Sequence, residues 1–184
     1  MRIAYWDIET HDLVAPFGPL LCASVLSLPD DKMRSFRMDT YIRSGKAEDM
    51  TDDRQLCIDL RDYLEEHHIT AGYFSKGFDI SHLRSRLVLH GERPLKEQLH
   101  LDPIWYFKGW RGLKFGSAKM KWVAEYLGLE PKPDVPAMVW LKARAGNRSA
   151  IREVVDRCEA DVRITRAIAE HAADLGFVKN IGRY

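Results

Sequence analysis

The chain has 184 residues, enough for a single domain that buries a substantial hydrophobic core. Hydrophobic residues make up 46% of it and charged residues 30%, which is typical of a globular protein in water, and we expect no membrane span and no secretion signal. The formal net charge of +1 excludes a strong general attraction to nucleic acid, so any such binding would need a local basic patch.

The elements predicted from residue patterns alternate between strands and helices. In chain order we expect strands at 2–8, 20–28 and 32–38, a helix from 50 to about 67, a strand at 69–74, a helix at 79–90, a short strand near 99–104, and helices at 117–127, 137–143 and 149–174. Ser117 and Ser149 are the expected first residues of their helices, and Gly128 is expected to end the helix that Ser117 begins. This order predicts an α/β fold, with a mixed five-stranded sheet flanked by helices, as one domain over residues 1–184.

The three cysteines, Cys22, Cys57 and Cys158, are scattered along these elements and have no Cys-x-x-Cys spacing. Their pattern predicts neither a zinc site nor a disulfide framework. A reducing, cytoplasmic location is therefore expected.

Two carboxylates, Asp7 and Glu9, lie two residues apart in the first predicted strand. Side chains at i and i+2 of a strand point to the same face, so both carboxylates point the same way. Two like charges on an apolar strand are unfavourable unless a cation lies between them, and Mg²⁺ or Mn²⁺ prefers such oxygen ligands. The alternative is that both residues lie at a frayed strand end and are only solvated.

Two further acids, Asp79 and Asp161, lie in predicted helices where they could also contribute to a metal site. Asp79 follows a short loop at the start of a predicted helix, where its ordinary role would be to cap the helix N-terminus. Asp161 lies near the apolar side of the last helix, where the alternative is a solvated charge that pairs with Arg157 or Thr165.

Taken together, three short motifs resemble those of the DEDD (DnaQ-like) exonuclease superfamily. They are Asp7-x-Glu9, Phe78-Asp79-x-x-x-Leu83 and Cys158-Glu159-x-Asp161-Val162. The segment from Leu113 to Lys132 is similar to the one before the third motif in the branch that contains family B polymerase proofreading domains and stand-alone exonucleases. The resemblance covers nearly the whole chain and implies a ribonuclease-H-like fold.

The resemblance also implies an activity, a metal site and partners. It makes Asp7, Glu9, Asp79 and Asp161 the catalytic acids that bind two Mg²⁺ or Mn²⁺ ions. Asp7 would bridge the two ions, Glu9 and Asp161 would complete the ion on the nucleophile side, and Asp79 would serve the other ion. The implied reaction is 3′–5′ hydrolysis at the 3′ end of single-stranded nucleic acid, DNA in preference to RNA. No polymerase domain is evident, so a replication or repair partner would act in trans.

The sequence departs from this family at the position of the residue that orients or deprotonates the attacking water. The family has a Tyr four residues before the last Asp or a His five before it, where this chain has Arg157 and Asp156. Arginine is permanently charged and cannot act as a general base, although Arg157 could clamp a phosphate. His11 and His82 are loose substitutes. The competing hypotheses are therefore a binding module that keeps the fold without useful catalysis and, more remotely, an endonuclease of the wider ribonuclease-H-like class.

A stretch rich in aromatic and basic residues, 105–115, could contact the nucleic acid. Such interleaving is typical of surfaces that stack bases and bind phosphates, and a buried aromatic cluster with a solvated basic edge is the alternative. The candidate substrate contacts are Phe78, Lys108, Arg111, Lys114 and Arg157.

Overall fold

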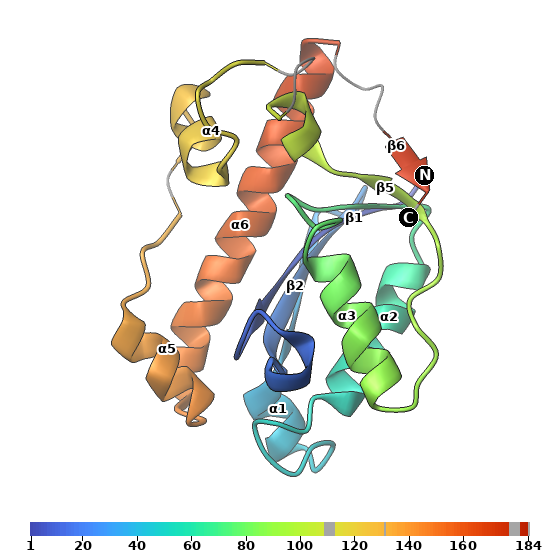
Figure 1. Cartoon of the computed structure of the whole chain (residues 1–184), viewed down its shortest axis with the longest axis vertical. Coiled ribbons are helices and arrows are strands. Elements are labelled where there is room, and N and C mark those ends of the chain that lie inside the picture. The colour runs from blue at the N-terminus through green and yellow to red at the C-terminus, as the bar shows by residue number, and fades with distance from the viewer. Residues whose placement is uncertain (109–112, 131, 177–180, 184) are drawn as a thin grey trace.

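The computed structural model describes residues 1–108, 113–130, 132–176 and 181–183. In these residues, six strands form one sheet in the order β3-β2-β1-β4-β5-β6 (Figure 1). They are β1 (Ile3–Thr10), β2 (Leu20–Leu28), β3 (Lys32–Arg37), β4 (Ile69–Ala71), β5 (Leu99–Leu101) and β6 (Ile181–Arg183).

The pairing of these strands makes the sheet mixed. β1, β2 and β3 pair antiparallel, whereas β4 pairs parallel with β1 and β5 parallel with β4. The predicted mixed sheet with flanking helices is confirmed, and β6 adds an antiparallel edge strand beside β5 that the sequence patterns did not predict.

Helices cover both faces of the sheet. The α-helices are α1 (Met38–Arg43), α2 (Arg54–Glu65), α3 (Asp79–Leu89), α4 (Met120–Tyr126), α5 (Ala137–Arg144) and α6 (Arg148–Asp174), with 3₁₀ turns η1 (Ala15–Phe17) and η2 (Pro103–Tyr106). Side chains of α1, α2 and α3 share one core cluster with β1 and β2. The long helix α6 packs with β1, β2 and β4 in a different cluster and joins α5 and α4 in two more (Figure 1).

The central strand β1 divides its side chains between these two cores. Ala4, Trp6 and Ile8 belong to the cluster with α2 and α3, whereas Tyr5 packs with residues of α6. Because alternate side chains of a strand point to the same face, Asp7 and Glu9 continue the Tyr5 side and face α6. The period-two pattern of β1 therefore decides which helix can meet the two acids.

Several predicted boundaries were wrong. The strand expected at 32–38 ends at Arg37 because α1 begins at Met38, and the strand expected at 69–74 ends at Ala71. α6 begins at Arg148, one residue before the predicted Ser149, and Asn147 caps it by accepting a hydrogen bond from the Ala150 N–H. Helix caps depend on local side-chain geometry, which several polar residues near a helix start can satisfy equally well in the sequence.

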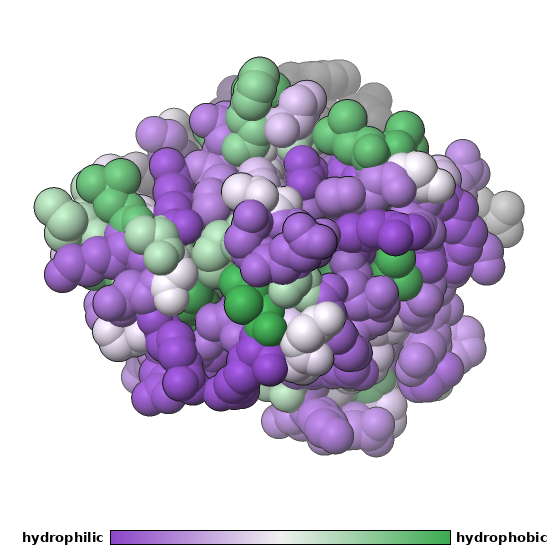
Figure 2. Space-filling model, turned by 90° about the horizontal axis from the view of Figure 1, so that it is seen from below, coloured by the Kyte–Doolittle hydropathy of each residue, from purple (hydrophilic) through white to green (hydrophobic). Residues whose placement is uncertain are grey.

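The face drawn in Figure 2 is mostly hydrophilic, with hydrophobic groups scattered in small separate patches. Exposed apolar side chains scattered in this way are ordinary on a protein surface. Within the residues described, no helix has the length and hydrophobicity needed to cross a membrane.

Candidate metal centre

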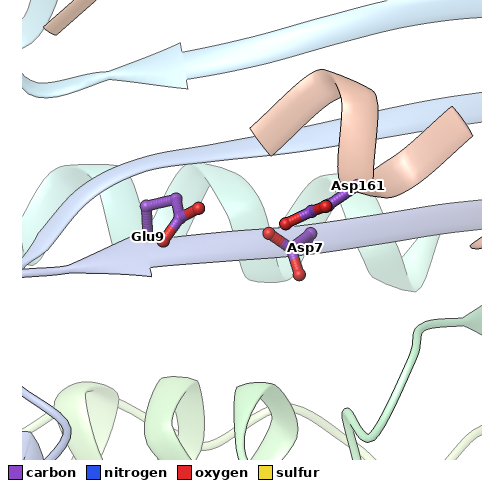
Figure 3. A group of neighbouring side chains, drawn as sticks. All are labelled: Asp7, Glu9 and Asp161. Carbon is purple, nitrogen blue, oxygen red and sulfur yellow. The ribbon is translucent and has the colours of Figure 1, made fainter. Parts of the chain in front are cut away.

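Three carboxylates meet between β1 and α6. One oxygen from each of Asp7, Glu9 and Asp161 lies within 4.8 Å of the others, and this is the one such metal-ligand group found in the described residues. Figure 3 shows the Asp7 carboxylate on β1 beside that of Asp161 from a turn of α6, with Glu9 further along the same strand. Asp161 is 5% exposed, so it is not the solvated helix charge that the alternative interpretation required.

The fourth predicted acid, Asp79, lies beside this cluster and is not one of its three members. It is buried at the first residue of α3, and its Oδ1 atom accepts a hydrogen bond from the Ile8 N–H at 3.2 Å. Phe78 occupies the N-cap position, so the capping role considered for Asp79 was wrong. This hydrogen bond instead fixes the start of α3 against β1, at the residue that lies between Asp7 and Glu9.

Electrostatic repulsion marks the cluster as unfavourable in the absence of a cation. Burial raises the pKa of Asp7 well above its usual range, and Cys158, Asp79, Glu9 and Asp161 raise it further. Burial also raises the pKa of Glu9 to about 7, although the nearby Arg157 opposes this shift. The pKa of Asp79 is likewise raised to about 7, mainly by burial. Clustered carboxylates with raised pKa values are typical of functional sites.

Two cationic side chains contact the cluster from its rim. The Lys132 ammonium donates a hydrogen bond to Asp161 Oδ2 at 2.9 Å. The Arg157 guanidinium forms an ion pair with Glu9, with 3.3 Å between Nε and Oε1, and donates a hydrogen bond to the Pro133 carbonyl. Arg157 is thus at the site as the sequence analysis allowed, but its partner is Glu9 and not Asp161.

The residues present fit a hard divalent ion such as Mg²⁺ or Mn²⁺. Asp161 Oδ1 is buried, and no described residue donates a hydrogen bond to it. A buried carboxylate oxygen without a partner is costly unless a cation or water satisfies it. All three clustered donors are carboxylate oxygens, the ligands that these ions prefer.

The remaining polar side chains of the motifs have structural partners. Glu159 points to β3, where it accepts a hydrogen bond from Ser35, and Asp156 is exposed. The thiol of Cys158 is buried and donates to the Asp7 carbonyl oxygen and carboxylate. Among the described residues no histidine joins the cluster, and the His82 ring donates to the Gly18 carbonyl.

The loop after β4 has a defined conformation that the sequence did not predict. Phe74 in this loop has a positive φ of 59° and an exposed ring. The Asp102 carboxylate holds this loop by accepting hydrogen bonds from the N–H groups of Phe74 and Lys76. Asp102 is a lone acid beside a proline in the sequence, and no local pattern there indicates this role.

The aromatic and basic stretch divides between core and surface. Tyr106 and Phe107 are buried and Phe115 packs against the same core cluster, as the alternative interpretation expected. Trp105 is exposed, and the Lys108 ammonium lies 5.7 Å from its ring centroid and 5.0 Å from that of Phe74.

The other predicted substrate contacts have different surroundings. Lys114 is exposed, whereas Arg111 and its neighbour Trp110 lie outside the described residues. Phe78 is partly buried against the core and packs on His82, with 5.0 Å between ring centroids.

A groove of about 480 Å³ opens beside the two rim cations. It lies between α4, α6 and the segment that joins α4 to α5. Its walls include Lys121, Leu129, Lys132, Arg157 and Ile164. A space of this size is in the range of small-molecule binding pockets.

Comparison with known proteins agrees with this architecture. The fold is similar to that of the family B DNA polymerase from the hyperthermophilic archaeon Pyrobaculum calidifontis, with a TM-score of 0.71 and 20% sequence identity. That match covers 94% of this chain and 24% of the polymerase, so the chain spans about a quarter of the polymerase's length. No curated protein matches the sequence. The family described as the RNase_H superfamily matches residues 4–173, and the chain therefore belongs to the ribonuclease H superfamily.

Proposed function

We propose that this protein is a metal-dependent 3′–5′ exonuclease that removes nucleotides from single-stranded nucleic acid, with DNA as the preferred substrate. The observation that carries the proposal is the meeting of Asp7, Glu9 and Asp161 around a buried Asp161 oxygen without a hydrogen-bond donor. Superfamily membership supports a nuclease, and the polymerase similarity supports the same fold. The cofactor proposed is a pair of Mg²⁺ or Mn²⁺ ions.

The chain's own residues divide the work of binding and positioning. Bound divalent ions supply charge stabilisation and an activated water in such sites. Asp7, Glu9 and Asp161 hold them, and Asp79 keeps the start of α3 against β1 through Ile8. Lys132 places a positive charge beside the carboxylates, where it offsets the charge of an incoming phosphate.

The substrate contacts proposed are those that present both charge and an aromatic face. Lys108 lies over Phe74 and Trp105, an arrangement that suits a stacked base next to a phosphate. Lys114 is exposed further along the same segment. The groove beside Lys132 and Arg157 offers space for a nucleotide next to the carboxylates. A replication or repair protein acting in trans remains the proposed partner.

Digestion of a 5′-labelled single strand tests the proposal. DNA and RNA oligonucleotides are incubated in parallel with Mg²⁺, Mn²⁺ or EDTA, and we expect a ladder that shortens from the 3′ end only when metal is present. Asp7→Ala should abolish the ladder, because Asp7 is the centre of the carboxylate group. Asp156→Ala is the matched control, since this aspartate is exposed on α6, and it should leave the ladder unchanged.

Other outcomes identify the competing functions. Binding of the intact oligonucleotide with no cleavage at high protein and Mn²⁺ concentrations would indicate a binding module that has lost catalysis. Cleavage of a circular single strand would indicate an endonuclease.

A further inference from the structure

Arg157 is held in place at the metal centre by contacts on several sides. Its Nε atom lies 3.3 Å from Glu9 Oε1, and one of its terminal nitrogens donates to the Pro133 carbonyl at 3.2 Å. Its guanidinium carbon lies 5.9 Å from the ring centroid of Trp140 in α5. The side chain is 22% exposed. These contacts give the guanidinium a defined position against one carboxylate of the cluster.

The charges of the centre are partly balanced before any metal binds. Lys132 pairs with Asp161 and Arg157 pairs with Glu9, while Asp7 and Asp79 have no ion-pair partner among the described residues. When all four acids are ionised, these two cations leave a formal charge of −2, which one divalent ion neutralises. A second ion near Glu9 would meet the positive charge of the guanidinium at short range.

Lys132 and Arg157 differ in how readily each can leave its carboxylate partner. The ammonium of a lysine sits on a flexible stem and can turn to another acceptor, whereas a guanidinium is planar and always charged. Moving Arg157 away from Glu9 would also break its bond to Pro133 and its contact with Trp140. An ion that displaces Arg157 must therefore compensate for more than one lost interaction.

We propose that Arg157 is a built-in competitor for one of the two metal positions, so that the protein binds its two divalent ions with unequal affinity. One ion binds first at the carboxylates that Arg157 does not contact, and the ion that needs Glu9 binds only when Arg157 is displaced. This inference rests on the proposed function, because it assumes that the cluster is a metal site. It assigns a role to Arg157, which stands at a position where the family resemblance would place a Tyr.

Binding of Mn²⁺ to the metal-free protein tests the competition without any nucleic acid or turnover. Free Mn²⁺ is counted by electron paramagnetic resonance while the metal is added to wild type and to variants. Wild type should bind one ion tightly and a second weakly. Arg157→Gln should tighten the second site by about tenfold or more and leave the first within about threefold, since it removes a unit charge next to Glu9.

The control variants separate charge from fold. Arg163→Gln removes the same charge from α6 at an exposed arginine that pairs with Glu159, and it should bind Mn²⁺ as wild type does. Arg157→Met keeps an aliphatic stem beside Trp140 and should tighten the second site as Arg157→Gln does. Arg157→Lys keeps the charge on a more flexible stem, so it should tighten the second site less than Arg157→Gln does. Circular dichroism checks that each variant is folded.

The outcomes separate this inference from the proposed function. If wild type binds and cleaves but both neutral Arg157 variants leave the second affinity unchanged or weaker, Arg157 is not a competitor and only the inference fails. Tightening by Arg157→Lys as large as that by Arg157→Gln would overturn it as well. If wild type binds no Mn²⁺, or Asp7→Asn binds as much as wild type, the proposed metal site itself is wrong.

Discussion

Folding places Asp7 in an electrostatically unfavourable position at this site. Burial raises its pKa most, and the neighbouring Cys158, Asp79, Glu9 and Asp161 raise it further. The largest influences on the pKa of Asp7 thus all raise it, in contrast to Glu9, where Arg157 and Lys132 oppose the increase. The residue proposed as most important for activity is therefore one that destabilises the metal-free fold, a common trade between function and stability.

The sign of this effect gives a prediction for Asp7→Asn. A carboxyl group whose pKa is raised by folding binds its proton more tightly in the folded state, so stability falls as the pH rises above about 4. Asparagine has a similar shape and no charge. In EDTA at pH 8, Asp7→Asn should raise the Tm, by about 2–4 °C for each kcal/mol relieved in a chain of this size. Differential scanning calorimetry measures this gain, which should vanish near pH 4.

Asp156→Asn is the control, because Asp156 is exposed on α6 and its substitution should leave the Tm unchanged at both pH values. A gain for Asp7→Asn that persists at pH 4, or no gain at pH 8, would contradict the account. Mn²⁺ should reverse the order at pH 8 by stabilising wild type through binding to the folded state.

At the scale of elements, a buried network fixes α3 against the sheet. Asp53, just before α2, is 0% exposed, and it forms an ion pair with Arg86 and a hydrogen bond with His90 at the end of α3. It also accepts a hydrogen bond from the Leu20 N–H at the start of β2. Burial alone would raise the pKa of Asp53, but the hydrogen bonds from Arg86, Leu20 and His90 hold it below its usual value. The helix that begins with Asp79 is thereby tied to β2 at its other end.

Asp53→Ala should therefore destabilise the protein strongly. It leaves Arg86 buried without its carboxylate, and the removal of one partner from a buried ion pair costs about 3–5 kcal/mol. Urea unfolding followed by circular dichroism should show a lower midpoint with an unchanged slope. The neighbouring Asp52→Ala, which is only partly buried, should cost less than about 1 kcal/mol. A similar small loss for Asp53→Ala would mean that the network contributes little.

Part of the candidate site could be predicted from the sequence. The alternation in β1 predicted that Asp7 and Glu9 point the same way, because strand periodicity determines the direction of side chains. That Asp161 joins them was implied by the family resemblance, and the structure brings the three carboxylates together. Lys132 was not predicted as a site residue. It lies in a Pro-rich connection, where no strand or helix periodicity determines the direction of a side chain. The partner of Arg157 could not be chosen either, since Glu9 and Asp161 are both within reach and three-dimensional packing decides between them.

Elements with strong patterns were likewise the best predicted. β2 has the predicted bounds, residues 20–28, because it is a long and almost fully buried apolar strand. β6 was missed because its pairing with β5 depends on tertiary contact more than on its own composition. The helix α1 was missed because it begins directly after β3 with no turn residue between them.

At the scale of the whole molecule, nearly balanced charge makes nucleic-acid binding a local property. A net charge of +1 gives little long-range attraction, so affinity must come from patches such as Lys108 with Phe74 and Trp105. The logarithm of the affinity for a single strand should fall linearly with the logarithm of the salt concentration, with a slope of about 0.7 for each phosphate contact.

Lys108→Ala should reduce that slope by about 0.7, corresponding to one lost phosphate contact. Fluorescence anisotropy of a labelled single strand in EDTA measures the slope without cleavage. Lys46→Ala is the control, because Lys46 pairs with Asp59 of α2, among the helices on the opposite face of the sheet from α6. A slope that is flat in wild type, or equal in the two variants, would show that Lys108 does not bind phosphate.

The contact between β1 and α6 can form only after both elements have been synthesised. Cys158 of α6 touches Asp7 across 151 sequence positions, and the clustered Asp161 lies one turn further on. During synthesis the amino-terminal part of a protein leaves the ribosome first, and contacts between distant segments form late. A nascent chain that has not reached α6 thus carries Asp7 and Glu9 without their third partner. A translation product interrupted before α6 would lack the complete centre, so the proposed nuclease activity would be withheld until α6 has been made.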